Sequence, residues 1–166
     1  MKFVDSASTK VTADIEVPRD WFFYWFTSVD LSRVMHGHGP LPAVTGIRDQ
    51  TGLMHIPGSS RMLLLSDGST AIEQTISCDP PNEVIYRLYK LTSFFRFIVS
   101  EAQGKIYFGE IGNIGTSVEW QYTFFGRSLV STLLLKILIP LLWKGFMQSA
   151  LTESKRLAEA EIANPS

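Results

Sequence analysis

Residues 116–125 read TSVEWQYTFF, and this stretch decides the fold. Bulky apolar side chains alternate strictly with polar ones along it, which is typical of a β-strand with one covered face and one face in water. The covered face carries Val118, Trp120, Tyr122 and Phe124. The preceding stretch, 97–111, has the same covered character at alternate positions. Another part of the chain must therefore cover this face of a sheet.

The C-terminal stretch can supply that cover. Polar residues recur at helical spacing between 128 and 156, Thr132 among them, and predict a helical stripe that faces solvent. The opposite stripe is apolar and consists of Leu142, Phe146, Ala150 and Leu157, flanked by Trp143 and Met147. Pro140 cannot donate to a helical hydrogen-bond ladder. We therefore expect a helix up to about residue 138, a kink or break, and a long helix over about 140–161.

Toward the N-terminus, short extended stretches are separated by turn signals. They lie at about 9–17, 43–49, 61–65, 69–78 and 84–91. Asp67-Gly68 is typical of a tight hairpin, and the other connections are rich in Gly, Pro and Asn. Strands joined mostly by tight turns predict an antiparallel meander. With the first strand added, the sequence predicts an α+β fold in which a seven-stranded curved antiparallel sheet wraps around a long C-terminal helix.

Two short helices are expected after the first strand. Pro18 suits a first helical turn, and the six consecutive aromatic residues at 21–26 predict a very apolar helix. Asp30 or Ser32 can cap a second helix that runs through Met35. Gly and Pro interrupt both periods in the residues that follow, so 36–42 is expected to be a loop.

Composition limits the functional classes. The chain has 166 residues, 45% of them hydrophobic, which suits a single domain over 1–166. Its formal charge of -1 provides no field to attract nucleic acid, so no nucleic-acid partner is expected. The lone Cys78 excludes an intramolecular disulfide, and the first residues lack the apolar run of a secretory signal. We therefore expect a cytoplasmic protein.

The segment 129–147 is the stretch most similar to a membrane span. A span needs roughly 20 consecutive apolar residues, and here Lys136, Pro140 and Lys144 interrupt the run. We expect no transmembrane helix. The aromatic helix and residues 129–142 nevertheless carry more apolar surface than a small domain easily hides. A homodimer interface or a peripheral membrane contact is therefore a further possibility for the 129–147 segment.

The order of elements resembles the START-like, or SRPBCC, superfamily, specifically its bacterial polyketide cyclase/dehydrase and lipid-transport branch. The sequence segments on which the resemblance rests are Gly46-Ile47-Arg48, Ser60-Arg61 to Asp67-Gly68, Glu73 followed by Asp79-Pro80-Pro81, Tyr86-Arg87, and Gly115-Thr116 with Val118 and Trp120. The likeness extends over nearly the whole chain. It implies a helix-grip fold, and it carries no catalytic signature.

The resemblance implies a cavity between the sheet and the terminal helix, suited to a lipid, an aromatic polyketide or a sterol-like molecule. The residues expected to line it are Trp25, Tyr86, Leu88, Phe108, Val118, Trp120, Tyr122, Trp143 and Met147. Without the resemblance, aromatic side chains at period-two spacing would be interpreted as ordinary core. The first hypothesis is a carrier or sensor of a hydrophobic small molecule, with no cofactor.

The alternative is an enzyme of the polyketide cyclase or dehydratase kind. The resemblance implies that Arg, Tyr or acidic side chains would hold the enol oxygens, and Arg61, Glu73 and Tyr86 are the candidates. Arg61 could also anchor a ligand carboxylate. For Glu73, a cross-strand ion pair with Arg61 or Arg87 on the water-facing side of the sheet is the expected structural role.

Other chemistry has little support. His36 and His38 could meet one metal with His55 or Asp79 as a third ligand, but histidines in a glycine-rich loop are usually solvated, so no metal is expected. The same loop, 36–42, is a candidate cavity entrance. Nucleophile elbows, phosphate-binding glycine loops and dinucleotide fingerprints are absent from the sequence. Asp79 beside Cys78 disfavours a thiolate, which indicates a structural cysteine.

Overall fold

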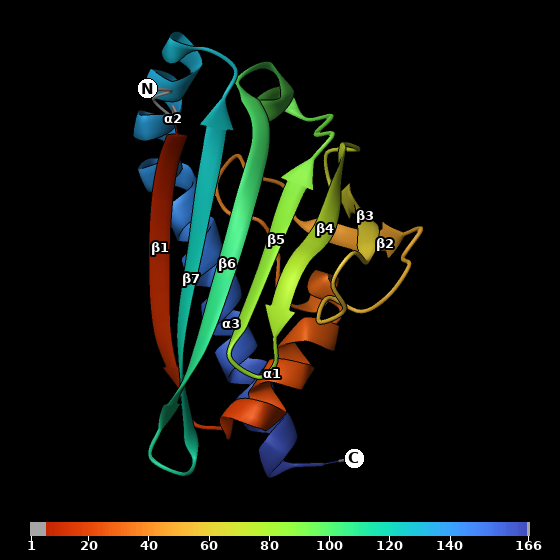
Figure 1. The fold of residues 1–166 in the computed structure, drawn as a ribbon, viewed down its shortest axis with the longest axis vertical. Helices are drawn as coiled ribbons and strands as arrows, with labels where there is room; N and C mark the ends of the chain where they lie inside the picture. The colour runs from red at the N-terminus through yellow and green to blue at the C-terminus, as the bar shows by residue number, and fades with distance from the viewer. Residues whose placement is uncertain (1–5, 166) are drawn as a thin grey trace.

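The computed structural model describes residues 6–165. The strands are β1 (Ser6–Ile15), β2 (Val44–Arg48), β3 (Ser60–Leu65), β4 (Thr70–Asp79), β5 (Glu83–Tyr89), β6 (Val99–Ile111) and β7 (Gly115–Gly126). The helical elements are α1 (Arg19–Ser28), η1 (Leu31–Arg33), η2 (Phe94–Phe97), α2 (Leu129–Leu138), η3 (Ile139–Trp143) and α3 (Lys144–Ala163). Figure 1 shows one curved sheet with the terminal helix lying against it.

The strands form one seven-stranded antiparallel sheet in the order β1-β7-β6-β5-β4-β3-β2. The strands β2 to β7 follow one another as the predicted meander, and β1 is added beside β7 (Figure 1). The Asp67-Gly68 hairpin joins β3 to β4, where the Asp67 carboxylate accepts the Ser69 N–H at 2.9 Å and Gly68 has a φ of 84°. The predicted helix-grip architecture is confirmed.

The terminal helix differs from the prediction at Pro140. No break occurs, because α2, η3 and α3 follow one another without a gap and η3 is a π-helical turn. Within that turn the Lys144 N–H donates to the carbonyl of Ile139, five residues back. Pro140 has no backbone N–H to donate, and the π turn accommodates this by widening the helix locally. The helix is therefore continuous through Pro140, and one widened turn stands where a kink or break is expected.

By length and composition, the helical run Leu129–Ala163 is the one stretch within residues 6–165 that could cross a membrane. Its second half lies in the grip of the sheet and buries Phe146, Met147 and Leu151 in the core. A span would have to remove these side chains from their present partners. The structure therefore gives α3 the role of a core helix.

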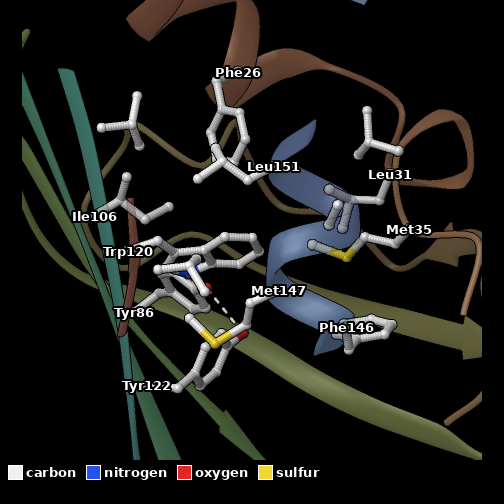
Figure 2. Close-up of a cluster of buried hydrophobic side chains, with 14 of the residues drawn as sticks. Phe26, Leu31, Met35, Tyr86, Ile106, Trp120, Tyr122, Phe146, Met147 and Leu151 are labelled. Atoms are coloured by element: carbon white, nitrogen blue, oxygen red, sulfur yellow. Dashed lines mark hydrogen bonds between the residues drawn. The ribbon is translucent and has the colours of Figure 1, made fainter. Parts of the chain in front are cut away.

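The concave face of the sheet carries the core (Figure 2). The β7 alternation is as predicted, since Val118, Trp120, Tyr122 and Phe124 are all buried. The aromatic residues of α1 close one end of this layer, where Phe22 and Phe23 are fully buried against Phe108. Burial of such large apolar surfaces is the main stabilising contribution, at about 25 cal/mol per Å².

Two local expectations need correction. The second short helix is the single 3₁₀ turn η1, which Asp30 caps by accepting the Ser32 N–H at 3.0 Å. Thr132, expected on the water-facing stripe, is buried and donates its hydroxyl to the Ser128 carbonyl at 3.0 Å. A threonine can face a core in this way because its hydroxyl is satisfied within the helix.

Candidate functional site

An apolar cavity of about 70 Å³ lies between the concave face of the sheet and the terminal helix. Strands β2 to β7 form its floor, and residues 35–42, η2, η3 and the start of α3 form its other walls. The residues that line it are Met35, Leu41, Pro42, Val44, Leu63, Leu65, Ala71, Glu73, Leu88, Leu91, Ser93, Phe95, Ala102, Tyr122, Phe124, Trp143 and Phe146. The wall is almost entirely apolar, which suits a hydrophobic molecule.

Glu73 is the one charged residue on this wall. It lies on β4 opposite Arg61 of β3, and Nε and Nη2 of Arg61 both reach its Oε1, at 2.8 and 2.6 Å. Both side chains are about 93% buried or more, with exposed fractions of 7% for Arg61 and 6% for Glu73. Glu73 Oε2 makes no hydrogen bond to any residue between 6 and 165. The site thus holds a buried carboxylate with one oxygen engaged and one free to accept.

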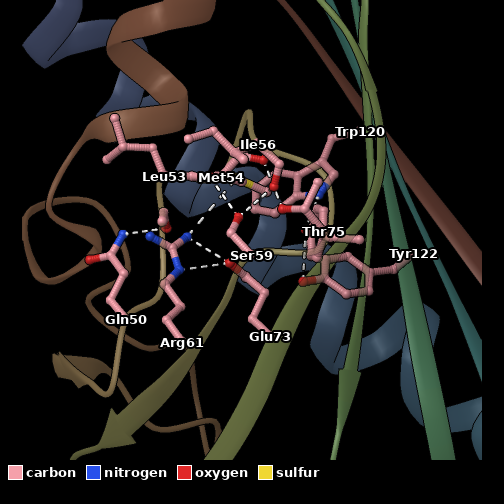
Figure 3. Close-up of polar contacts among 12 residues, drawn as sticks. Gln50, Leu53, Met54, Ile56, Ser59, Arg61, Glu73, Thr75, Trp120 and Tyr122 are labelled. Carbon is pink, nitrogen blue, oxygen red and sulfur yellow. Dashed lines mark hydrogen bonds and ion pairs between the residues drawn. The ribbon is translucent and has the colours of Figure 1, made fainter.

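The cross-strand ion pair was predicted, but its place on the water-facing side is wrong. Glu73 shares the concave face with Ala71 and Thr75, which are also buried. Figure 3 shows Glu73 between Arg61 and the Tyr122 side chain. The apolar Ile72 lies on the outer face of β4, half-buried, so the alternation of this strand does not follow polarity. Arg87, the other expected partner, instead binds Gln74 and Glu101.

Behind the cavity floor, three aromatic side chains share a hydrogen-bond chain (Figure 2). The Trp120 indole N–H donates to the Tyr86 hydroxyl at 2.9 Å, and the Tyr86 hydroxyl donates to that of Tyr122 at 2.8 Å. Burial raises the pKa of both tyrosines, and the nearby Glu73 carboxylate raises it further. Both phenols therefore stay protonated at neutral pH and act as neutral donors. Tyr122 carries this chain to the cavity surface.

Trp143 enters the cavity wall from the π turn. Its ring contacts those of Tyr122, Phe124 and Phe95, with centroids 5.3, 5.0 and 6.1 Å away. The indole Nε1 is buried and has no hydrogen-bond partner in the described part of the chain. An orphaned buried donor costs about 1–3 kcal/mol. Because most buried polar groups are paired, such a donor calls for a specific explanation, such as a functional role or a bound water.

The structure separates the nine predicted ligand-contacting residues into three groups. Leu88, Tyr122 and Trp143 line the cavity, and so does Glu73, a catalytic candidate. Tyr86, Phe108, Val118, Trp120 and Met147 are fully or almost fully buried core residues outside its lining. Trp25 lies on α1, where its indole donates to Glu161 at 2.6 Å. Arg61 touches the cavity only through Glu73. Direct ligand contact by the nine residues that were expected to line the cavity stays a prediction.

Several lining residues were missed. Phe95, Leu63, Leu65 and Phe124 all contribute to the wall. A period-two signal existed for β3, because Leu63 and Leu65 follow Arg61 at alternate positions. No such signal existed for Phe95, because it lies in the short 3₁₀ turn η2, in the connection between the predicted extended stretches 84–91 and 97–111.

The other sequence candidates lie outside this cavity. No group of three His, Cys, Asp or Glu residues within 6–165 could hold a metal ion. His38 forms an isolated bridge with Leu41, which fixes the fold of the 36–42 loop. Burial, and then the Asp79 carboxylate, raise the pKa of the Cys78 thiol. This direction agrees with the protonated, structural cysteine that was predicted.

Comparison with known proteins supports the fold. No family model and no curated protein matches the sequence. A point mutant of norcoclaurine synthase from Thalictrum flavum, in complex with a transition-state analogue, matches with a TM-score of 0.69 and 12% identity over 95% of this chain and 96% of that chain. Major latex-like protein 151 from Panax ginseng matches with a TM-score of 0.65 and 13% identity, over 92% of this chain and 97% of that chain.

A third match is a biosynthetic protein. The di-domain ARO/CYC BexL of the BE-7585A pathway matches with a TM-score of 0.65 and 17% identity, over 93% of this chain and 50% of that chain. At these identities the likeness concerns the fold. The chain has the helix-grip fold of START-like, or SRPBCC, proteins, as its sequence indicated.

Proposed function

We propose that the protein binds and carries a hydrophobic small molecule that bears one hydrogen-bonding group, such as a lipid, an aromatic polyketide or a sterol-like alcohol. The observation that carries this proposal is an apolar cavity whose few polar groups include an unengaged carboxylate oxygen on Glu73. Trp143 adds an indole N–H without a partner among residues 6–165. Apolar walls supply affinity, and a few placed polar groups orient the ligand.

The cavity must widen to admit such a ligand. Its volume of about 70 Å³ is far below the roughly 300–1,000 Å³ of typical small-molecule sites. The 36–42 loop is the wall that we propose moves as a unit, because residues 36–40 are exposed or half-buried, and Gly37 and Gly39, with φ angles of 87° and 55°, provide flexible positions. We therefore propose that this loop opens when the ligand binds.

We also propose that the protein acts in the reducing cytosol, because a single free cysteine suits that compartment.

Binding of a dansylated fatty acid by the full chain tests the proposal. The probe should gain fluorescence with the parent protein, and native mass spectrometry of gently purified protein should show a retained ligand. Ala71→Leu adds bulk to the cavity wall and should abolish probe binding. Ala13→Leu makes the same change on β1, outside the lining, and should leave binding intact. Equal probe binding by both variants would overturn the proposed site.

A second candidate function is proton abstraction next to a carbonyl group, as in a cyclase-type enzyme. Its support is the buried Glu73 carboxylate on the cavity wall, with the protonated Tyr122 hydroxyl as a neutral donor for a developing enolate oxygen. Deuterium exchange into an aryl methyl ketone, followed by NMR, tests this function. Glu73→Gln should stop the catalysed exchange, and residual dansyl probe binding by this variant verifies that the cavity still forms. Exchange no faster than in buffer would exclude this reaction for that substrate class.

A further inference from the structure

Helix α2 turns its apolar side outward. Its buried side carries the polar Ser131 and Thr132 beside Leu135, and the hydrogen bonds of both hydroxyl residues are made within the helix, to Ser128. The outward side carries large aliphatic residues at helical spacing, namely Leu129, Val130, Leu133, Leu134, Ile137 and, on the adjoining π turn, Leu141. Their exposed fractions range from 45 to 68%. This arrangement is the reverse of an ordinary surface helix.

Two further aromatic side chains extend this exposed apolar area. Phe94 and Phe97 on η2 are 68% and 61% exposed. The η2 turn is tied to the start of α2, because Arg127 donates its Nε–H to the Arg96 carbonyl at 2.6 Å. Figure 1 shows η2, the short green coil between β5 and β6, at the same end of the molecule as α2. We call these eight apolar residues the end surface.

Five basic residues lie in, or close in sequence to, the elements that carry the end surface. Lys90, Arg96, Arg127, Lys136 and Lys144 are all exposed, and none forms an ion pair with a residue that the structure describes. No acidic residue occurs between Glu83 and Glu101, or between Glu119 and Glu153. Most other described basic residues are paired, as Lys10 is with Glu119. The free positive charge is thus concentrated beside the exposed apolar side chains.

We propose that the end surface docks on an anionic lipid bilayer, with its aliphatic and aromatic side chains among the acyl chains and its basic residues at the headgroups. An apolar face bordered by Lys and Arg is the pattern of a helix that lies in a membrane interface. A second copy fits less well. A two-fold contact would bring two sets of unpaired basic residues together without any acidic partner on either surface.

The end surface adjoins the wall of the cavity. Phe95 and Trp143 line the cavity, and the exposed Phe94 and Leu141 are their close neighbours on η2 and η3. A docked molecule would therefore hold its cavity next to the membrane, where a hydrophobic ligand can pass without crossing water. This last step rests on the proposed function, whereas docking itself does not.

Vesicle flotation of the full chain tests docking. The parent protein should bind vesicles of phosphatidylglycerol mixed with phosphatidylcholine, and should bind less at high salt, because screening weakens surface attraction. Leu133→Ser with Ile137→Ser should remove binding. Ile76→Ser with Ile114→Ser changes two exposed apolar residues outside the end surface and should not. Lys136→Glu should weaken binding about tenfold, and Arg48→Glu, at an exposed unpaired arginine of β2, should not.

The other outcomes contradict the proposal. Equal binding to vesicles of phosphatidylcholine alone would show that the basic residues do not contribute to docking. Vesicle binding that survives Leu133→Ser with Ile137→Ser would show that the end surface is not the membrane contact. If the parent protein binds no vesicles but is a dimer in light scattering, and the same double variant is a monomer, the end surface is a dimer interface instead. The Ala71→Leu variant separates the two proposals, because it should lose the dansyl probe and still float with vesicles. Unchanged melting temperatures verify that the surface variants fold.

Discussion

Oε1 of Glu73 accepts a hydrogen bond from Nε of Arg61 and also forms the ion-pair contact with Nη2, so both contacts with Arg61 fall on a single carboxylate oxygen beneath the cavity wall. The positive charge of Arg61 therefore compensates the negative charge of the carboxylate, while Oε2 of Glu73 can still accept a hydrogen bond. A charge in this position is held in place by its partner, and its free oxygen can still meet a ligand.

Removal of one member of this ion pair should be costly. Arg61→Leu leaves the Glu73 carboxylate buried without a partner and should lower the free energy of unfolding by about 3–5 kcal/mol. Replacement of both residues with leucine should recover most of the loss, because no buried charge remains. Urea denaturation of the two variants measures the difference. A double variant as unstable as the single one would show that the pair has another structural role.

Gly104 leaves the space that the Tyr86 ring occupies. A Cβ at residue 104 would lie 2.2 Å from the Tyr86 ring carbon Cζ. Gly104→Ala should therefore displace the buried tyrosine and lower stability by about 1–3 kcal/mol. Gly46→Ala is the matched control on β2, since the nearest atom to its added Cβ is 3.8 Å away. Equal melting temperatures for the two variants would contradict this close approach.

Alkaline pH should destabilise the protein through Tyr86 and Tyr122. Because burial raises the pKa of both phenols, the unfolded chain loses these protons at lower pH than the native protein does. Their contribution is complete below the ordinary pKa of about 10 and is lost as pH rises above it. Urea unfolding at a series of alkaline pH values measures the slope. Tyr86→Phe with Tyr122→Phe should flatten it, although the variant is less stable throughout.

Acid should weaken the contact between the C-terminal helix and the segment that follows β1. Hydrogen bonds from Arg33 and Trp25 lower the pKa of Glu161 below its ordinary value of 4.5. The stabilisation is therefore present above that value and disappears as pH falls through the lower, native pKa. Glu161→Gln should lose stability at neutral pH and change less with acid than the parent does. Parallel pH profiles for the two proteins would exclude this contribution.

The fold was predictable because its signals are local. Alternation on β7, the Asp67-Gly68 turn and the aromatic α1 helix each define one element, and the structure confirms them. The site was harder, because its residues meet only in three dimensions. Glu73 was assigned to the wrong face since β4 carries Ile72 on its outer side. The outward apolar side of α2 contradicts the rule that polar residues face water, so periodicity assigned Thr132 wrongly.

The pairing of β1 with β7 gives the chain a particular order of synthesis. Val17 and Thr116, which share a hydrogen bond at the end of these strands, are 99 positions apart. On the ribosome, β1 emerges before the other six strands, and its one strand partner within residues 6–165, β7, is made last. Contacts of this separation slow folding, because a long loop must close before they form. The nascent chain must therefore keep its first strand from pairing with other polypeptides until β7 arrives.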